Sequence, residues 1–248
     1  MAKVIIALLV AVLYIWVIMV TMPYRREVIQ NQDLTDYYAN LDLEFSRAKN
    51  DYESRKANAN TKVDQLLDAE ERLALLHWEK REYDRAVELL DDVVNKRKPA
   101  ADAPYDDRYI NSLLHLAGVY RDVNNWQVAE MQYQDVYSYD KRFFEKTDPD
   151  NSKIARDLNN LGLLYYLKGT SEKDEKSRNE VLKQSSGFLN EALKKYRAKL
   201  GADSPSEAIS LWNLYLAERD QGNVDLANKL KAKAESIDAK MNRPVKAP

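Results

Sequence analysis

Four stretches of the sequence share one pattern, clear in the two middle copies and weaker in the first and last: a leucine, a small residue after it, usually an aromatic residue four positions past the leucine, and a second small residue that opens another helical stretch. The copies are Leu73, Ala74 and Ala86; Leu116, Ala117, Tyr120 and Ala129; Leu161, Gly162, Tyr165 and Ser185; and Leu214, Gly222 and Ala227. The second small residues lie 43, 56 and 42 positions apart. A period near 42 residues built from helix pairs predicts an all-α solenoid, because one helix pair cannot bury its apolar face alone.

Composition agrees with one sizeable helical domain. The chain has 248 residues, of which 45% are hydrophobic and only six are glycine. The 38 Lys and Arg residues against 40 Asp and Glu residues give a formal charge of -2, so no overall basic surface indicates nucleic-acid binding. The absence of cysteine from the sequence excludes a disulfide framework, a thiolate zinc site and a cysteine nucleophile.

The N-terminal part predicts a membrane anchor over residues 1–23. Val4 to Met22 is a run of 19 residues without a charge, which at about 1.5 Å per residue reaches the roughly 30 Å of a bilayer's hydrocarbon layer. A cleaved signal peptide would have a shorter apolar stretch and small residues at its exit, whereas this run leads into Met22 and Pro23. We therefore expect an uncleaved single-pass transmembrane helix.

The side of the membrane is set by basic residues near the span. Lys3 and the terminal amine precede it, and Arg25, Arg26, Arg47 and Lys49 follow it. This bias favours a cytoplasmic repeat domain. A short tail ahead of a single span can also remain inside, and the repeats would then lie on the opposite side.

Residues 24–61 contain a predicted juxtamembrane amphipathic helix. Apolar residues recur at alternating spacings of four and three, at Leu34, Tyr38, Leu41, Phe45, Ala48 and Tyr52. Such a stripe is typical of a short coiled coil that dimerises the protein, or of a helix that folds back on the first repeat. Two tyrosines, a phenylalanine and an alanine make a poor coiled-coil seam, so we favour packing on the repeats.

The repeat region resembles a known family. The stretch Leu158 to Tyr165, the end of that repeat at Asn190 to Leu193, and the linker Leu200 to Pro205 are similar to the tetratricopeptide repeat (TPR), in the 42-residue form found in kinesin light chains. The resemblance covers roughly Lys62 to Met241 as repeats at about 62–98, 106–144, 151–200 and 205–241, with a disordered tail expected at 242–248.

Two features depart from the repeat pattern. The first repeat has Glu70 where the others have leucine, at Leu113, Leu158 and Leu211, as terminal repeats often do. After Gly169 the chain inserts Thr170 to about Val181, a mostly charged segment. We interpret this insertion as a solvated extension of the third helix pair or a mobile loop, with a recognition loop as the sharper alternative.

The resemblance implies a partner-binding groove lined by the first helix of each pair, with asparagines ahead of the conserved leucine contacting a bound peptide's main chain. Asn160 and Asn213 match that position, and His115 replaces it in the second repeat. Helical spacing adds neighbours expected to line the groove, namely Arg121, Arg156, Asn159, Leu163, Tyr166, Trp212, Leu216 and Arg219. An exposed polar residue with no ligand is the alternative interpretation for each amide.

Catalysis has no support in the sequence. His77 and His115 lie in separate repeats without metal-ligand companions at helical spacing, and no phosphate-binding glycine loop or nucleophile elbow occurs. We expect no catalytic residue, cofactor or metal site. The predicted function is that of a membrane-anchored scaffold that holds a partner protein or peptide, and the alternative is a self-associating structural membrane protein in which the repeats are a spacer.

Overall fold

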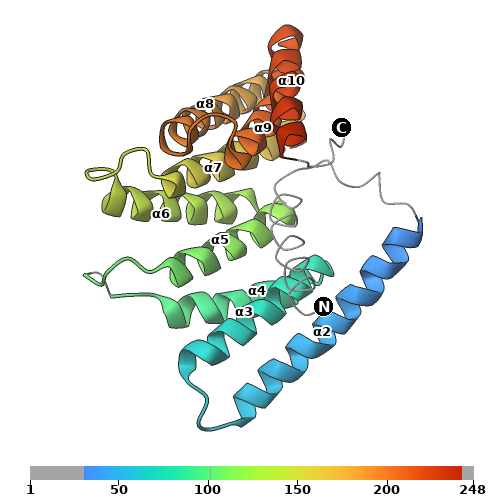
Figure 1. Cartoon of the computed structure of the whole chain (residues 1–248), viewed down its shortest axis with the longest axis vertical. Coiled ribbons are helices and arrows are strands. Elements are labelled where there is room, and N and C mark those ends of the chain that lie inside the picture. The colour runs from blue at the N-terminus through green and yellow to red at the C-terminus, as the bar shows by residue number, and fades with distance from the viewer. Residues whose placement is uncertain (1–30, 101, 242–248) are drawn as a thin grey trace. The chain divides into compact units, whose positions relative to one another are not determined.

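The computed structural model describes residues 31–100 and 102–241, and for residues 31–36 it describes the backbone alone. Within these residues the chain forms nine α-helices, labelled α2 to α10 in Figure 1, and no strand. They divide into two compact units, residues 31–139 and residues 140–241, and each unit is described by itself. The all-α class predicted from the repeat pattern is confirmed.

The unit of residues 31–139 is a succession of packed helices. It contains α2 (Asn31–Ala57), α3 (Val63–Glu79), α4 (Tyr83–Arg97), α5 (Asp107–Asp122) and most of α6 (Trp126–Phe144). Helix α3 contacts α2, α4 and α5, and α4 also contacts α5. The first helices of two successive pairs therefore meet along one side, as helical repeats require to bury their apolar faces.

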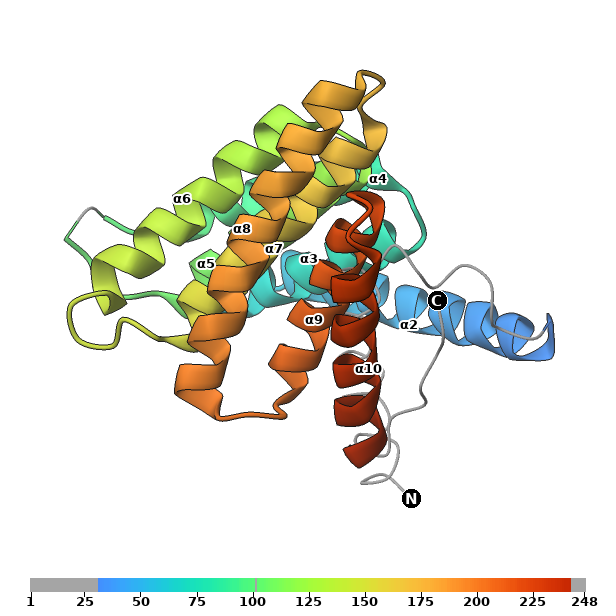
Figure 2. The ribbon, with the colours of Figure 1, turned by 90° about the horizontal axis from the view of Figure 1, so that it is seen from above.

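The unit of residues 140–241 holds two further helix pairs. It contains α7 (Ser152–Ser171), α8 (Glu175–Leu200), α9 (Pro205–Asp220) and α10 (Val224–Lys240). Figures 1 and 2 show α7 beside α8 and α9 beside α10. The small residue of the repeat pattern explains the closeness of the first pair, because a Cβ added to Gly162 would lie 2.5 Å from Leu189 Cγ. The Ser185 hydroxyl also donates to the Gly162 carbonyl at 2.7 Å.

Three of the four pairs are closed by the same three-residue link. Its middle residue has positive φ, 63° at Arg81, 61° at Asn124 and 84° at Gly222. In each link the middle N–H bonds a carbonyl three residues back and the next N–H bonds one five residues back, as Glu82 does to His77. This is the Schellman pattern, which satisfies the last carbonyls of the first helix and turns the chain sharply.

The inserted segment lengthens the third pair. Helix α7 runs to Ser171 and α8 begins at Glu175, so most of Thr170 to Val181 is helical. The Asp174 side chain accepts the Ser177 N–H at the start of α8. Gly169 continues the close contact, since a Cβ there would lie 2.9 Å from Leu182 Cδ2. The segment is therefore an extension of the helix pair.

Helix α2 lies antiparallel to α3, because contacts that advance along α2 retreat along α3. Phe45 stacks edge-on against His77 at 4.8 Å, and Tyr52 reaches Glu70 farther toward the start of α3. Leu41, Ala48 and Tyr52 of the apolar stripe are buried. These three residues of the apolar stripe are thus buried by packing within the chain. This is the arrangement expected of a helix that folds back on the first repeat.

The predicted span from Val4 to Met22 falls outside the described residues. Among residues 31–100 and 102–241, none of the helices has the length and apolar character needed to cross a bilayer.

Candidate partner-binding face

The amide of Asn160 is the group on α7 that best fits contact with a partner. Asn160 is half-buried, and no described residue forms a hydrogen bond with its side chain. Arg156, one helical turn earlier, is also half-buried. An amide donates and accepts at once, so Asn160 can pair with a peptide unit of an extended chain.

The two other predicted asparagines of this unit form a buried cluster between α7 and α9. Asn159 Oδ1 accepts from Ser210 Oγ at 3.0 Å and from Asn213 Nδ2 at 3.2 Å. Asn213 is fully buried, and its own Oδ1 has no partner among the described residues. The structure therefore places Asn159 and Asn213 inside the helix contact, behind the surface on which we expected them.

Arg156 is fixed by two buried carboxyl groups. Its Nη2 lies 3.1 Å from Asp140 Oδ2 and 3.0 Å from Asp157 Oδ1, and both aspartates are fully buried. Burial raises the pKa of Asp157 well above its usual range, and the Arg156 charge offsets only part of that rise, while Asp140 adds to it. Arg156 thus pairs with two buried carboxyl groups of its own unit, while 29% of its side chain stays accessible.

Tyr166 and Arg219 meet at Asp220. The Tyr166 hydroxyl donates to Asp220 Oδ2 at 2.9 Å, and Arg219 Nε donates to Asp220 Oδ1 at 2.7 Å. Burial, and then the Asp220 charge, raise the pKa of Tyr166, so its hydroxyl stays a donor at neutral pH. Of these two predicted groove residues, Arg219 is exposed and Tyr166 is buried.

Trp212 belongs to the core between α9 and α10. It is 8% exposed, its Nε1 donates to Asp238 Oδ2 at 2.9 Å, and its ring packs edge-on against Tyr215 at 5.8 Å. Leu163 and Leu216 are buried as well. The expectation that Trp212 lines a groove is not matched by its position, because the indole is directed at the second helix of its own pair.

In the unit of residues 31–139, His115 joins an ion-pair cluster that sequence reasoning missed. Its Nδ1 lies 3.0 Å from Glu71 Oε1, and Glu71 also accepts from Ser112 and Arg97. Arg97, which is nine-tenths buried, further donates to Asp68 at 2.6 Å. Burial alone would raise the pKa of Glu71, but the hydrogen bonds and charges of His115 and Arg97 lower it.

Arg121 is placed in the core and not on a groove. Its side chain is 2% exposed, and both its Nε and its Nη2 donate to Asp122 Oδ1, at 2.9 and 2.7 Å. Tyr133 of α6 is its second partner.

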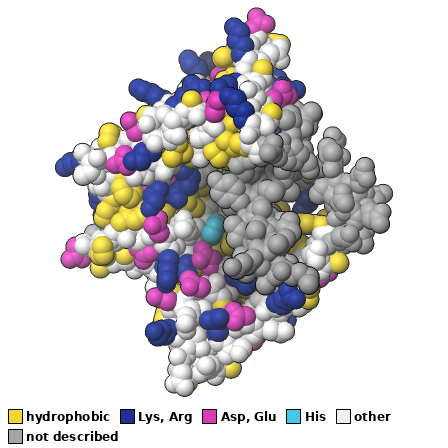
Figure 3. Space-filling model, in the orientation of Figure 1, with side chains coloured by type: hydrophobic (Ala, Val, Ile, Leu, Met, Phe, Trp, Pro, Cys, Tyr) yellow, Lys and Arg dark blue, Asp and Glu magenta, His cyan; other side chains and the backbone are white. Residues whose placement is uncertain are grey.

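On the face that Figure 3 shows, Lys and Arg side chains alternate with Asp and Glu side chains, so a surface dominated by one charge is not seen there.

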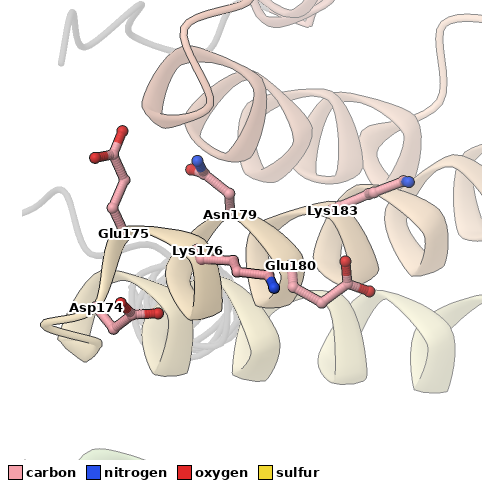
Figure 4. Close-up of a pocket in the computed structure, with 6 residues that line it drawn as sticks. All are labelled: Asp174, Glu175, Lys176, Asn179, Glu180 and Lys183. Atoms are coloured by element: carbon pink, nitrogen blue, oxygen red, sulfur yellow. The ribbon is translucent and has the colours of Figure 1, made fainter.

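A surface depression lies at the start of α8. It is lined by Asp174, Glu175, Lys176, Asn179, Glu180 and Lys183. Figure 4 shows these side chains extending from one stretch of helix and its cap without converging on an enclosed space. Within the described ranges no group of three or more His, Cys, Asp or Glu side chains is arranged to hold a metal ion.

Comparison with known proteins gives the fold class. No protein-family model matches the sequence, and no curated protein matches it. Among solved structures, BtubC (BKLC) from P. vanneervenii matches with a TM-score of 0.63 and 17% identity, over 84% of this chain and 77% of that one.

Two further matches are crystal structures of a Podosopora anserina putative kinesin light chain with nearly identical TPR-like repeats. The first matches with a TM-score of 0.60 and 17% identity, over 83% of this chain and 90% of that one. The second matches with a TM-score of 0.52 and 18% identity, over 86% and 91%. This chain therefore has a TPR-like helical-repeat fold of the kinesin-light-chain type.

Proposed function

We propose that this chain is a membrane-anchored scaffold that holds a partner protein or extended peptide on the first helices of its repeats. The observation that carries the proposal is Asn160, whose amide is half-buried and forms no hydrogen bond with any described residue, on a helix where Asn159 is already paired. An accessible amide fixed on a rigid helix can bond a peptide main chain without reading its side chains. The TPR-like fold supports a role in protein interaction.

The uncharged run from Val4 to Met22 supports the anchor, since its length matches a bilayer's hydrocarbon layer. The basic residues Arg25 and Arg26 favour a repeat domain on the cytoplasmic side. Extraction of native membranes with alkaline carbonate tests the anchor separately from partner binding. Release of the full-length protein by that treatment would contradict the proposed anchor. It would not bear on the proposed partner-binding face.

Partner binding is tested with a photo-crosslinking side chain at position 160, introduced into the full-length protein in its native membrane. The matched control is position 228, because Asn228 is an exposed asparagine on α10. We expect a cross-linked polypeptide at 160 and none at 228. Equal cross-linking at both positions, or none at 160, contradicts the proposed face.

Substitution of the amide tests its contribution. We expect Asn160→Ala to weaken capture about two- to tenfold, as the loss of one or two hydrogen bonds implies, and Asn228→Ala to leave it unchanged. The structural alternative, self-association through residues 34–52, is not favoured by any described contact, since Leu41, Ala48 and Tyr52 are buried within the chain.

A further inference from the structure

The contact between α2 and α3 differs in chemistry from the contacts inside the helix pairs. Of residues 37–57 of α2, only Leu41, Ala48 and Tyr52 are buried. Helix α5, with 16 residues, has eight buried residues. Helix α4, with 15 residues, has six. Because burial of apolar surface is the main stabilising contribution between helices, α2 is held less firmly than α4 and α5.

Polar groups form several of the other contacts between α2 and α3. Asp42 pairs with Lys80 at 2.5 Å, Glu44 pairs with Arg72 at 2.7 Å, and the Tyr37 hydroxyl donates to Glu79. Asp42 and Arg72 have exposed side chains, at 68% and 58%, so solvent and salt screen both ion pairs. Contacts of this kind fix the register of a helix but contribute little to its stability.

Glu70 explains why the first repeat departs from its pattern. It stands where the other repeats have a leucine, is 4% exposed, and accepts from the Tyr52 hydroxyl at 3.3 Å. Burial raises the pKa of Glu70, and the neighbouring Asp92 charge raises it further. A leucine at this position would bury more apolar surface without the cost of burying a carboxyl group. The carboxyl of Glu70 therefore fixes the position of α2 along α3 through Tyr52, but it weakens the attachment of α2.

We propose that α2 is a detachable clasp, held on α3 by Tyr52–Glu70 and by salt-sensitive ion pairs, which opens while the helix pairs stay folded. Helix α2 has 27 residues and is about 40 Å long. Its link to α3, residues 58–62, contains two asparagines and no described helix. Release of α2 would allow the repeats to lie farther from the point at which the chain enters the bilayer, and this consequence rests on the proposed anchor.

Amide hydrogen exchange of the full-length protein in detergent micelles tests the clasp. We expect residues 37–57 to exchange faster than α4, and faster still when salt is raised from 0.1 to 1 M, which shortens the screening length from about 10 Å to about 3 Å. Protection of α4 and α5 should not change. Exchange of α2 that equals that of α4 at every salt concentration overturns the proposal.

A matched pair of tyrosine variants tests the register contact. Tyr52→Phe removes the hydroxyl that bonds Glu70, whereas Tyr38→Phe removes a hydroxyl from an exposed side chain of the same helix, 58% accessible. We expect Tyr52→Phe to speed exchange in residues 37–57 about three- to tenfold, with no effect of Tyr38→Phe. Equal effects of the two variants overturn the proposal.

The salt series on the unmodified protein remains decisive if Tyr52→Phe lowers the stability of the whole domain. Neither readout depends on a partner. A missing cross-link at position 160 would contradict the proposed binding face and leave the clasp standing, whereas uniform exchange would contradict the clasp alone.

Discussion

Two glycine-to-alanine substitutions on facing helices should differ in their effects on stability. Gly162 in α7 and Gly187 in α8 both lie inside helices, where alanine is intrinsically favoured by about 1 kcal/mol. At Gly187 an added Cβ has nothing within 4 Å, so Gly187→Ala should show that whole gain. At Gly162 the Cβ would lie 2.5 Å from Leu189 Cγ and 2.7 Å from its Cδ2.

The clash at Gly162 has no easy relief. Leu189 is fully buried, and its backbone nitrogen also lies only 3.3 Å from the added Cβ. Overpacking of this kind costs about 1–3 kcal/mol, so the net effect of Gly162→Ala is from about zero to about 2 kcal/mol of destabilisation. The two variants should therefore differ by about 1–3 kcal/mol.

Thermal unfolding followed by circular dichroism measures the difference. For a chain of this size 1 kcal/mol corresponds to about 2–4 °C in Tm, so Gly187→Ala should raise Tm by about that amount. Gly162→Ala should leave Tm unchanged or lower it by up to about 8 °C. Equal increases in both variants would refute the close α7–α8 contact at Gly162.

The remaining predictions concern charged groups. Hydrogen bonds from Lys233 and Lys240 lower the pKa of Asp203 to about 2, so its contribution to stability is present above the unfolded-state pKa near 4 and is lost as pH falls through about 2. Thermal melts across this range should show Asp203→Asn less stable than the unmodified protein at pH 6 but equal to it near pH 2; a difference that persists at about pH 2 would contradict the assignment. Arg97→Met should destabilise the protein by about 3 kcal/mol in denaturant titrations, because Glu71, only 14% exposed, loses its ion pair with Arg97, and an effect below about 1 kcal/mol would contradict the described cluster.

The helix pairs could be predicted from sequence because their cause is local. A leucine followed by a small residue recurs where two helices approach closely, and Gly162 against Leu189 shows that contact directly. The breaks were equally readable, since Pro205 at the first turn of α9 and the cap Ser204 are signals that act within a few residues.

The candidate site was less predictable because neighbouring helix positions differ by about 100° in direction. Asn159 and Asn160 are adjacent, yet Asn159 bonds Ser210 inside the α7–α9 contact, whereas Asn160 is half-buried and bonds no described residue. Spacing gives the stripe to which a residue belongs but not how far the next helix covers it. For the same reason Trp212 was assigned to a groove, whereas it packs toward α10.

The ion-pair cluster around Glu71 could not be found by any spacing rule. Its partners Arg97 and Ser112 are 26 and 41 positions away, and only the stacking of α3, α4 and α5 brings them together. Glu70 is the exception, because its departure from the leucine of the other repeats was visible in the sequence. The sequence did not show that the Glu70 carboxyl accepts a hydrogen bond from Tyr52 of α2.

The link between α7 and α8 is the point at which this chain tolerates a change of length. The links at Arg81, Asn124 and Gly222 each need a left-handed residue at a fixed offset from the helix end, so an added residue would misdirect the returning helix. Residues 172–174 carry no such requirement, and α8 restarts from its own cap at Asp174. A peptide tag or fluorescent reporter placed between Glu172 and Asp174 would extend outward from the ends of two long helices and leave the hairpins on either side as they are.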